Sequence, residues 1–121
     1  MARKLRLDRP GCFHHVMGRG NAGREIFKDG EDRQEFLRLL GDGVERFGHS
    51  VHAYCLMENH FHLVVRTGKT PLSVIMQNLM SRYTRYVNRR TRRYGHLFQG
   101  RFKSVLRALA RSGKRNATNQ A

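Results

Sequence analysis

The order of predicted elements along this chain indicates an α+β fold, a ferredoxin-like sandwich in which an antiparallel sheet carries two helices on one face. Three observations predict it. Four short runs, at residues 12–19, 49–56, 61–67 and 97–105, are apolar and β-prone. Two longer segments, 31–47 and 71–90, repeat apolar residues at helical spacing. The resulting order of strand, helix, strand, strand, helix, strand fits one domain of 121 residues.

The first half of the chain supplies one strand and one helix. Residues 12–19 form the strand, in which we expect Phe13 to face the core, and a Gly-rich turn follows it. The helix over 31–47 has an apolar face that consists of Phe36, Leu37, Leu40, Val44 and Phe47. Gly41 and Gly43 weaken the middle of this helix.

The second half supplies a hairpin, a long helix and a last strand. A turn at Glu58 and Asn59 joins the strands 49–56 and 61–67. Pro71 suits the first position of the helix over 71–90. The core-facing stripe of that helix consists of Leu72, Ile75, Met76, Leu79, Met80, Tyr83 and Val87. The strand 97–105 completes the sheet.

This order predicts three segments. Residues 1–11 form a basic N-terminal arm and residues 12–106 form the folded domain. Residues 107–121 are small, polar and basic, which is typical of a disordered tail.

The positive charge is concentrated in the second half of the chain. The first 58 residues carry ten Lys and Arg against all nine Asp and Glu, whereas the remaining residues carry 14 Lys and Arg and no acid. Such a field favours a polyanionic partner, with nucleic acid first. A membrane surface is disfavoured, because the apolar face of the basic helix is expected in the core.

Composition also bears on location and redox state. No apolar run approaches the roughly 20 residues of a membrane-spanning helix. The basic N-terminus lacks the apolar core of a secretion signal, so we expect a cytoplasmic protein. The only cysteines, Cys12 and Cys55, are far apart in strand-like runs, and we expect them to be buried and reduced.

Two histidines stand at the start of the third predicted strand. His60 and His62 are separated by one residue, so they point to the same face of the strand while Phe61 packs beneath them. Two ligands do not close a structural zinc site, but they suit an open site completed by water and a substrate oxygen. A pair of hydrogen-bonded histidines without metal is the alternative, and both interpretations remain open here.

Several motifs together resemble the single-tyrosine HUH transposases, in particular the REP-associated tyrosine transposases, relatives of the transposases of small insertion sequences. The resemblance covers about residues 12–106 and keeps the family's order of motifs. The motifs are His15-Val16, Gly18-Arg19-Gly20-Asn21, Ile26-Phe27, Met57-Glu58-Asn59-His60-Phe61-His62-Leu63, Tyr83-Thr84-Arg85-Tyr86-Val87-Asn88 and the segment 95–104.

The resemblance implies metal-dependent DNA strand transfer. His60 and His62 would bind a divalent Mg or Mn ion, and a tyrosine would attack the scissile phosphate to form a phosphotyrosine link. The partner would be single-stranded or hairpin DNA, and family members often form homodimers. DNA contacts are predicted for eight residues, Arg19, Asn21, Arg82, Arg85, Arg89, Arg90, Arg101 and Lys103.

The chain departs from the family at the nucleophile. The family tyrosine lies on a helix after the fourth strand, whereas residues 107–121 contain no tyrosine, so we expect that helix to be missing. Tyr83 is predicted to pack in the core, and Tyr86 and Tyr94 could stack on bases. No tyrosine is therefore assigned as catalytic. Glu58 could add a carboxylate to the histidines only if the turn did not break their alignment.

Three functional interpretations remain. The first is a transposase that cuts and joins DNA. The second is a DNA-binding module that no longer cleaves. The third is an RNA-binding domain, which should expose aromatic side chains on its sheet.

Overall fold

The structure, a computed structural model, describes residues 10–109 and follows the predicted order of elements. The elements are β1 (Cys12–Arg19), the 3-10 turn η1 (Asn21–Gly23), α1 (Gly30–Phe47), β2 (Ser50–Met57), β3 (His60–Arg66), α2 (Leu72–Thr91) and β4 (Lys103–Leu109). The strands pair antiparallel in the order β2-β3-β1-β4. This α+β arrangement confirms the predicted ferredoxin-like fold class.

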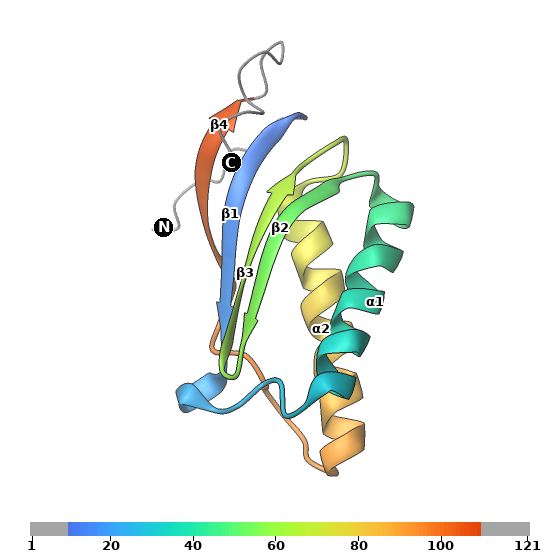
Figure 1. Ribbon diagram of the computed structural model, residues 1–121, viewed down its shortest axis with the longest axis vertical. Coiled ribbons are helices and arrows are strands. Elements are labelled where there is room, and N and C mark those ends of the chain that lie inside the picture. The colour runs from blue at the N-terminus through green and yellow to red at the C-terminus, as the bar shows by residue number, and fades with distance from the viewer. Residues whose placement is uncertain (1–9, 110–121) are drawn as a thin grey trace.

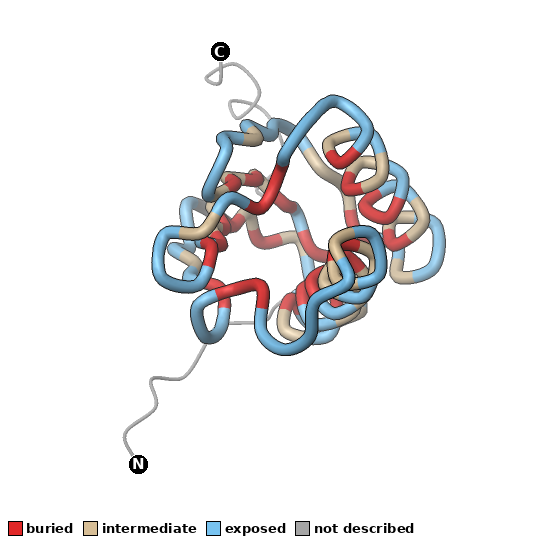
Figure 2. Tube along the Cα trace, turned by 90° about the horizontal axis from the view of Figure 1, so that it is seen from below, coloured by how far each residue is buried: buried red, intermediate tan, exposed pale blue. Residues whose placement is uncertain are grey.

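Both helices cover the same face of the sheet, and no described helix lies on the other face (Figure 1). The buried segments lie between the two layers (Figure 2). All seven residues of the stripe predicted for α2 are buried. An antiparallel sheet tolerates one face without a covering layer, because its side chains alternate between core and solvent. We call the uncovered side the open face.

Helix α1 has clear signals at both ends. The Asp29 side chain caps its N-terminus by accepting a hydrogen bond of 3.1 Å from the Asp32 backbone N–H. Gly48 ends the helix at a φ of 80°, a left-handed conformation that suits glycine. The chain then enters β2 directly.

No helix in the described part of the chain is long and apolar enough to cross a membrane.

The last strand was predicted wrongly at its start. Residues 97–102 are apolar enough to read as a strand, but β4 begins only at Lys103. Leu97, Phe98 and Phe102 are buried because they pack on the core from an irregular segment. β4 also continues to Leu109, so residues 107–109 belong to the sheet and not to the predicted tail. The predictions for residues 1–9 and 110–121 lie outside the described residues.

Two side chains face the opposite way from prediction. β1 buries Cys12, His14, Val16 and Gly18, so Phe13 lies half-buried on the open face. There the centroids of the Phe13 and His52 rings are 5.1 Å apart, and Cζ of the Arg66 guanidinium lies 5.6 Å from the Phe13 ring centroid. Cys55, expected to be buried, is exposed, whereas Cys12 is buried as predicted.

His49 predicts a pH dependence of stability. It is 3% exposed, neither ring nitrogen has a hydrogen-bond partner among residues 10–109, and burial lowers its pKa below 6.5. Below pH 6.5 the unfolded chain therefore binds a proton that the folded chain resists, and the free energy of unfolding falls with decreasing pH. The contribution of one such proton is at most about 1.4 kcal/mol per pH unit.

The variant His49→Leu should flatten this dependence between about pH 7 and pH 5 in denaturant titrations. His52→Leu removes an exposed histidine and serves as the control, because it should keep the wild-type slope. Equal slopes in wild type and His49→Leu would contradict the assignment to His49.

Candidate functional site

The candidate site is built on the alternation of β3. Phe61, Leu63 and Val65 are buried, so His60 and His62 project together on the open face, as predicted. The Phe61 ring packs against Phe36, with 5.0 Å between the ring centroids. It also fills the space above Gly18 on β1, where an added Cβ would lie 2.4 Å from the ring. Burial of this one ring fixes the face on which both histidines lie.

The two histidines are neighbours and each has one ring nitrogen engaged. Their ring centroids are 5.1 Å apart, in an edge-to-face arrangement. Asn59 Oδ1 lies 2.9 Å from His60 Nδ1. Because an amide oxygen can only accept, His60 Nδ1 is the donor, which leaves Nε2 with its lone pair in the neutral ring.

A third histidine, His15 of β1, joins the pair. Its Nε2 lies 3.0 Å from His62 Nδ1, with one nitrogen donating and the other accepting. The sequence motif contains His15, but its role was missed because only the β1–β3 register places it diagonally across from His62. Burial, then the neighbouring His62 and the positive charge of Arg107, lower the pKa of His15. Burial, then the neighbouring His62 and Arg19, lower the pKa of His60. Lowered pKa values favour the neutral form of these rings, which is the form that coordinates a metal.

The described residues do not close a metal site on their own. No group of three or more His, Cys, Asp or Glu in residues 10–109 is arranged to hold a metal ion. Glu58 lies in the turn between Met57 and His60, so the expected break in alignment is confirmed. Its backbone oxygen instead accepts hydrogen bonds from the N–H groups of Ile26 and Phe27, at 2.7 Å and 3.1 Å. Any ion at His60 and His62 would need further ligands from elsewhere.

The open face is basic and has no acidic side chain on its strands. None of β1 to β4 contains Asp or Glu. Arg19 lies opposite His60 in the β1–β3 register, and Lys103 lies opposite Met17 in the β1–β4 register. The acidic residues of the described chain are in α1, in the segment before it and in the Glu58 turn. This separation of charge suits a polyanion on the open face.

The eight predicted DNA contacts divide into two groups. Arg82 pairs with Asp42 at 2.6 Å, and Arg90 pairs with Asp32 as well as with Asp29 at 3.0 Å and Glu31 at 3.4 Å. These two arginines therefore have carboxylate partners within the fold, although the second half of the chain itself carries no acid. The pairs join the C-terminal half of α2 to α1 and the segment before it.

The other predicted contacts are placed at the surface. Arg19, Arg85, Arg89, Arg101 and Lys103 are exposed, and none forms an ion pair within the described residues. Asn21 opens η1, and its backbone N–H donates to Leu97 O at 2.9 Å. Guanidinium and ammonium groups without carboxylate partners are available to phosphate oxygens.

No strand of the described sheet carries a tyrosine on the open face. Tyr83 is fully buried, as predicted, and donates a hydrogen bond of 2.6 Å to Ile26 O. Burial and a hydrogen bond to Asp32 raise the pKa of Tyr86 to about 12. Tyr54 lies opposite Leu63, whose side chain points to the helices. Tyr94 is 93% exposed in the segment after α2.

Sequence comparison connects this site with a family. Residues 9–108 match the profile of the family described as IS200-like transposase, which is most of the chain. The chain belongs to the IS200-like transposase family. No curated protein matches its sequence.

Two solved structures of transposases share the fold. One is a REP-associated tyrosine transposase bound to a REP hairpin, with a TM-score of 0.72 and 13% identity over 88% of this chain. The match covers 62% of that protein, so this chain spans less than two thirds of its relative. The other, from Deinococcus radiodurans R1, is described as a transposase and has a TM-score of 0.63 and 14% identity, over 87% of this chain and 83% of that one.

The ion-paired and the exposed arginines of α2 predict different effects of neighbouring substitutions on stability. Arg90→Gln should leave Asp32, which is 4% exposed, without its cationic partner, and should lower the melting temperature by about 5 °C. Arg89→Gln removes an exposed charge from the same helix and should leave the melting temperature unchanged. Thermal unfolding followed by circular dichroism measures both, and equal melting temperatures would show that the Arg90 pairs do not stabilise the fold.

Proposed function

We propose that this chain binds single-stranded or hairpin DNA across the open face of its sheet. The observation that carries the proposal is the convergence of His15, His60 and His62 with unpaired basic residues on a face whose strands have no acid. The related transposase bound to a REP hairpin supports DNA as the polyanion. Arg19 and Lys103 would contact phosphates beside the histidines, and Arg85, Arg89 and Arg101 would do so beyond them. Arg82 and Arg90 would stabilise the fold through their ion pairs and would not contact the DNA.

The proposal includes a divalent Mg or Mn ion held by Nε2 of His60 and of His62. The fit rests on the fixed ring orientations: Asn59 Oδ1 holds His60, and His15 Nε2 holds His62 if it accepts the proton of Nδ1. A bound divalent ion would supply charge stabilisation to a phosphate oxygen. His15 would be a positioning residue, since it acts through His62. Water and DNA phosphate would provide the oxygen ligands that both ions prefer.

Cleavage is a separate question from binding, because it needs a nucleophile. Strand transfer through a phosphotyrosine is what the resemblance implies. Yet Tyr83 is buried, the pKa of Tyr86 is raised, and Tyr54 points away from the histidines. The exposed Tyr94 lies in the segment between α2 and β4 and belongs to none of the strands that form the open face. We infer that the residues described here bind DNA without cutting it, and that cleavage requires a tyrosine supplied from elsewhere.

RNA binding is the second candidate, and Phe13 is the one observation in its favour. Its half-buried ring lies on the open face, whereas the sequence predicted it to face the core. However, the described strands carry no second aromatic ring of Phe, Tyr or Trp type on that face, whereas RNA-binding sheets of this topology stack two or three bases.

The test is incubation of the purified protein with Mn²⁺ and a labelled DNA hairpin that has a single-stranded extension. A mobility shift without a covalent band on a denaturing gel would support binding without cleavage. A covalent band would contradict that part, and mapping of the linked tyrosine would identify the nucleophile. An RNA hairpin of the same sequence is the competitor, and preferential binding of RNA would favour the second candidate.

Substitution of the histidines tests the proposed metal site directly. His60→Ala or His62→Ala should abolish binding of Mn²⁺, measured by paramagnetic resonance or calorimetry. His15→Phe should weaken it roughly tenfold, as loss of a partner that orients a ligand does. The control His96→Ala removes a histidine outside the open face and should bind Mn²⁺ as wild type does. Unchanged affinity in His60→Ala and His62→Ala would refute the metal site.

A further inference from the structure

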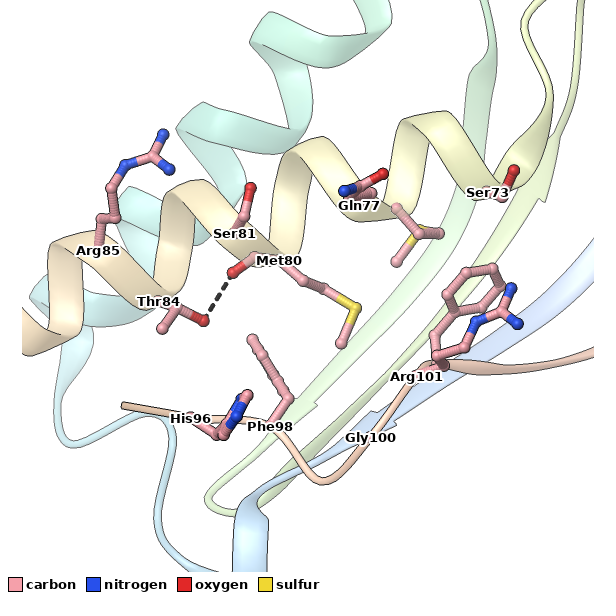
Figure 3. Close-up of a pocket in the computed structure, with 12 residues that line it drawn as sticks. Ser73, Gln77, Met80, Ser81, Thr84, Arg85, His96, Phe98, Gly100 and Arg101 are labelled. Atoms are coloured by element: carbon pink, nitrogen blue, oxygen red, sulfur yellow. Dashed lines mark hydrogen bonds between the residues drawn. The ribbon is translucent and has the colours of Figure 1, made fainter. Parts of the chain in front are cut away.

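A cavity on the helix side of the molecule has no part in the histidine site. It lies between α2 and residues 96–102, the irregular segment that leads into β4, and its volume is about 720 Å³. Figure 3 shows Met80 and Phe98 approaching one another from these two sides. The volume falls within the range of pockets that bind small ligands, about 300–1,000 Å³.

The lining combines apolar side chains with polar groups that can recognise a ligand by hydrogen bonding. Met76, Met80, Phe98 and Phe102 line it, and each is at most 9% exposed. Gln77 is exposed on α2 and contributes an amide with both donors and an acceptor, and Ser73 and Ser81 contribute hydroxyl groups. Planar rings and thioethers stack well against other flat groups, and a side-chain amide matches the edge of a nucleobase.

The charge of the lining selects the class of ligand. Arg101 lies at one end of the cavity and Arg85 of α2 at the other, where its guanidinium extends away from residues 96–102 (Figure 3). His96 adds an imidazole, and none of the described lining residues is acidic. A ligand that is both flat and apolar in one part and anionic in another fits this combination. We propose that this cavity binds an unpaired nucleotide of the DNA, with the base against the apolar floor and the phosphates near the arginines.

The position of the cavity relative to the histidines supports the same DNA strand reaching both. Gln99 N–H donates to Arg19 O at 2.8 Å, and Phe98 forms a β-bridge with Gly20. The segment that lines the cavity is thus held directly beside the end of β1, where Arg19 lies opposite His60. The proposed path of the DNA strand therefore runs from Arg19 past residues 98 and 99 into the cavity.

This inference rests on the proposed DNA binding and adds a site specific for unpaired nucleotides. The probes are a DNA hairpin with a single-stranded thymidine extension and the same hairpin with a blunt end. Gln77→Trp fills the cavity from α2. Its matched control is Val74→Trp on the same helix, because Val74 is 43% exposed and does not line the cavity.

Wild type should bind the extended hairpin more tightly than the blunt one. Gln77→Trp should weaken binding of the extended hairpin about tenfold and leave the blunt hairpin unchanged, since one stacked base is worth roughly that much. Val74→Trp should bind both as wild type does. Equal effects of the two variants, or wild-type affinities in Gln77→Trp, would overturn the inference while the proposed function stands. Failure of wild type to bind either hairpin would overturn both.

A second measurement does not depend on a substitution. Photo-crosslinking of wild type to the extended hairpin, with 4-thiothymidine in the extension, should attach to residues 73–85 or 96–102. Attachment confined to the strands of the open face would overturn the cavity assignment. Competition by an acidic peptide as effective as that by the thymidine extension would also overturn it, because the cavity would then select charge without a base.

Discussion

Burial of Phe61 is the interaction on which the rest of the site depends. The ring is fully buried between the sheet and the helices, and Gly18 leaves the space that it occupies. A shift of β3 by one residue would place two imidazoles in an aromatic core and a phenyl ring in water, at a cost of several kcal/mol. The orientation of His60 and His62 is therefore secured by an apolar contact on the opposite side of the strand. The histidines themselves contribute little to that choice.

The distribution of charge follows from the same two-layer construction. Most of the acidic residues lie in α1 and in the segment before it, and some of them form ion pairs with Arg82 and Arg90 of α2. Asp32, 4% exposed, accepts from Arg90, from the Tyr86 hydroxyl and from the Lys28 backbone N–H. Buried carboxylates need such partners, so these cations are committed to the fold. By contrast, Arg19 and Lys103 on the sheet and Arg85 and Arg89 on α2 form no ion pair within residues 10–109.

The sequence predicted what depends on local periodicity and missed what depends on register. The α2 stripe, the β1 limits and the shared face of His60 and His62 each follow from spacing along one element. Phe13 was placed in the core because of its residue type, but the alternation of β1 buries His14 and Val16 instead. His15 was not assigned because its contact with His62 joins two strands 47 residues apart. The late start of β4 has a similar cause, since residues 97–102 owe their burial to tertiary packing.

These differences change how the two faces of the molecule can be used. The open face presents half-buried imidazoles, sulfur atoms and basic groups on regular strands, so its geometry is rigid and its chemistry suits phosphate and metal. The flank of α2 presents methionine side chains and an irregular segment, which adapt more readily to a flat ligand. Residues 96–102 are bonded to β1 on one side and line the cavity on the other. Residues 96–102 therefore connect the cavity to the end of β1 that places Arg19 opposite His60.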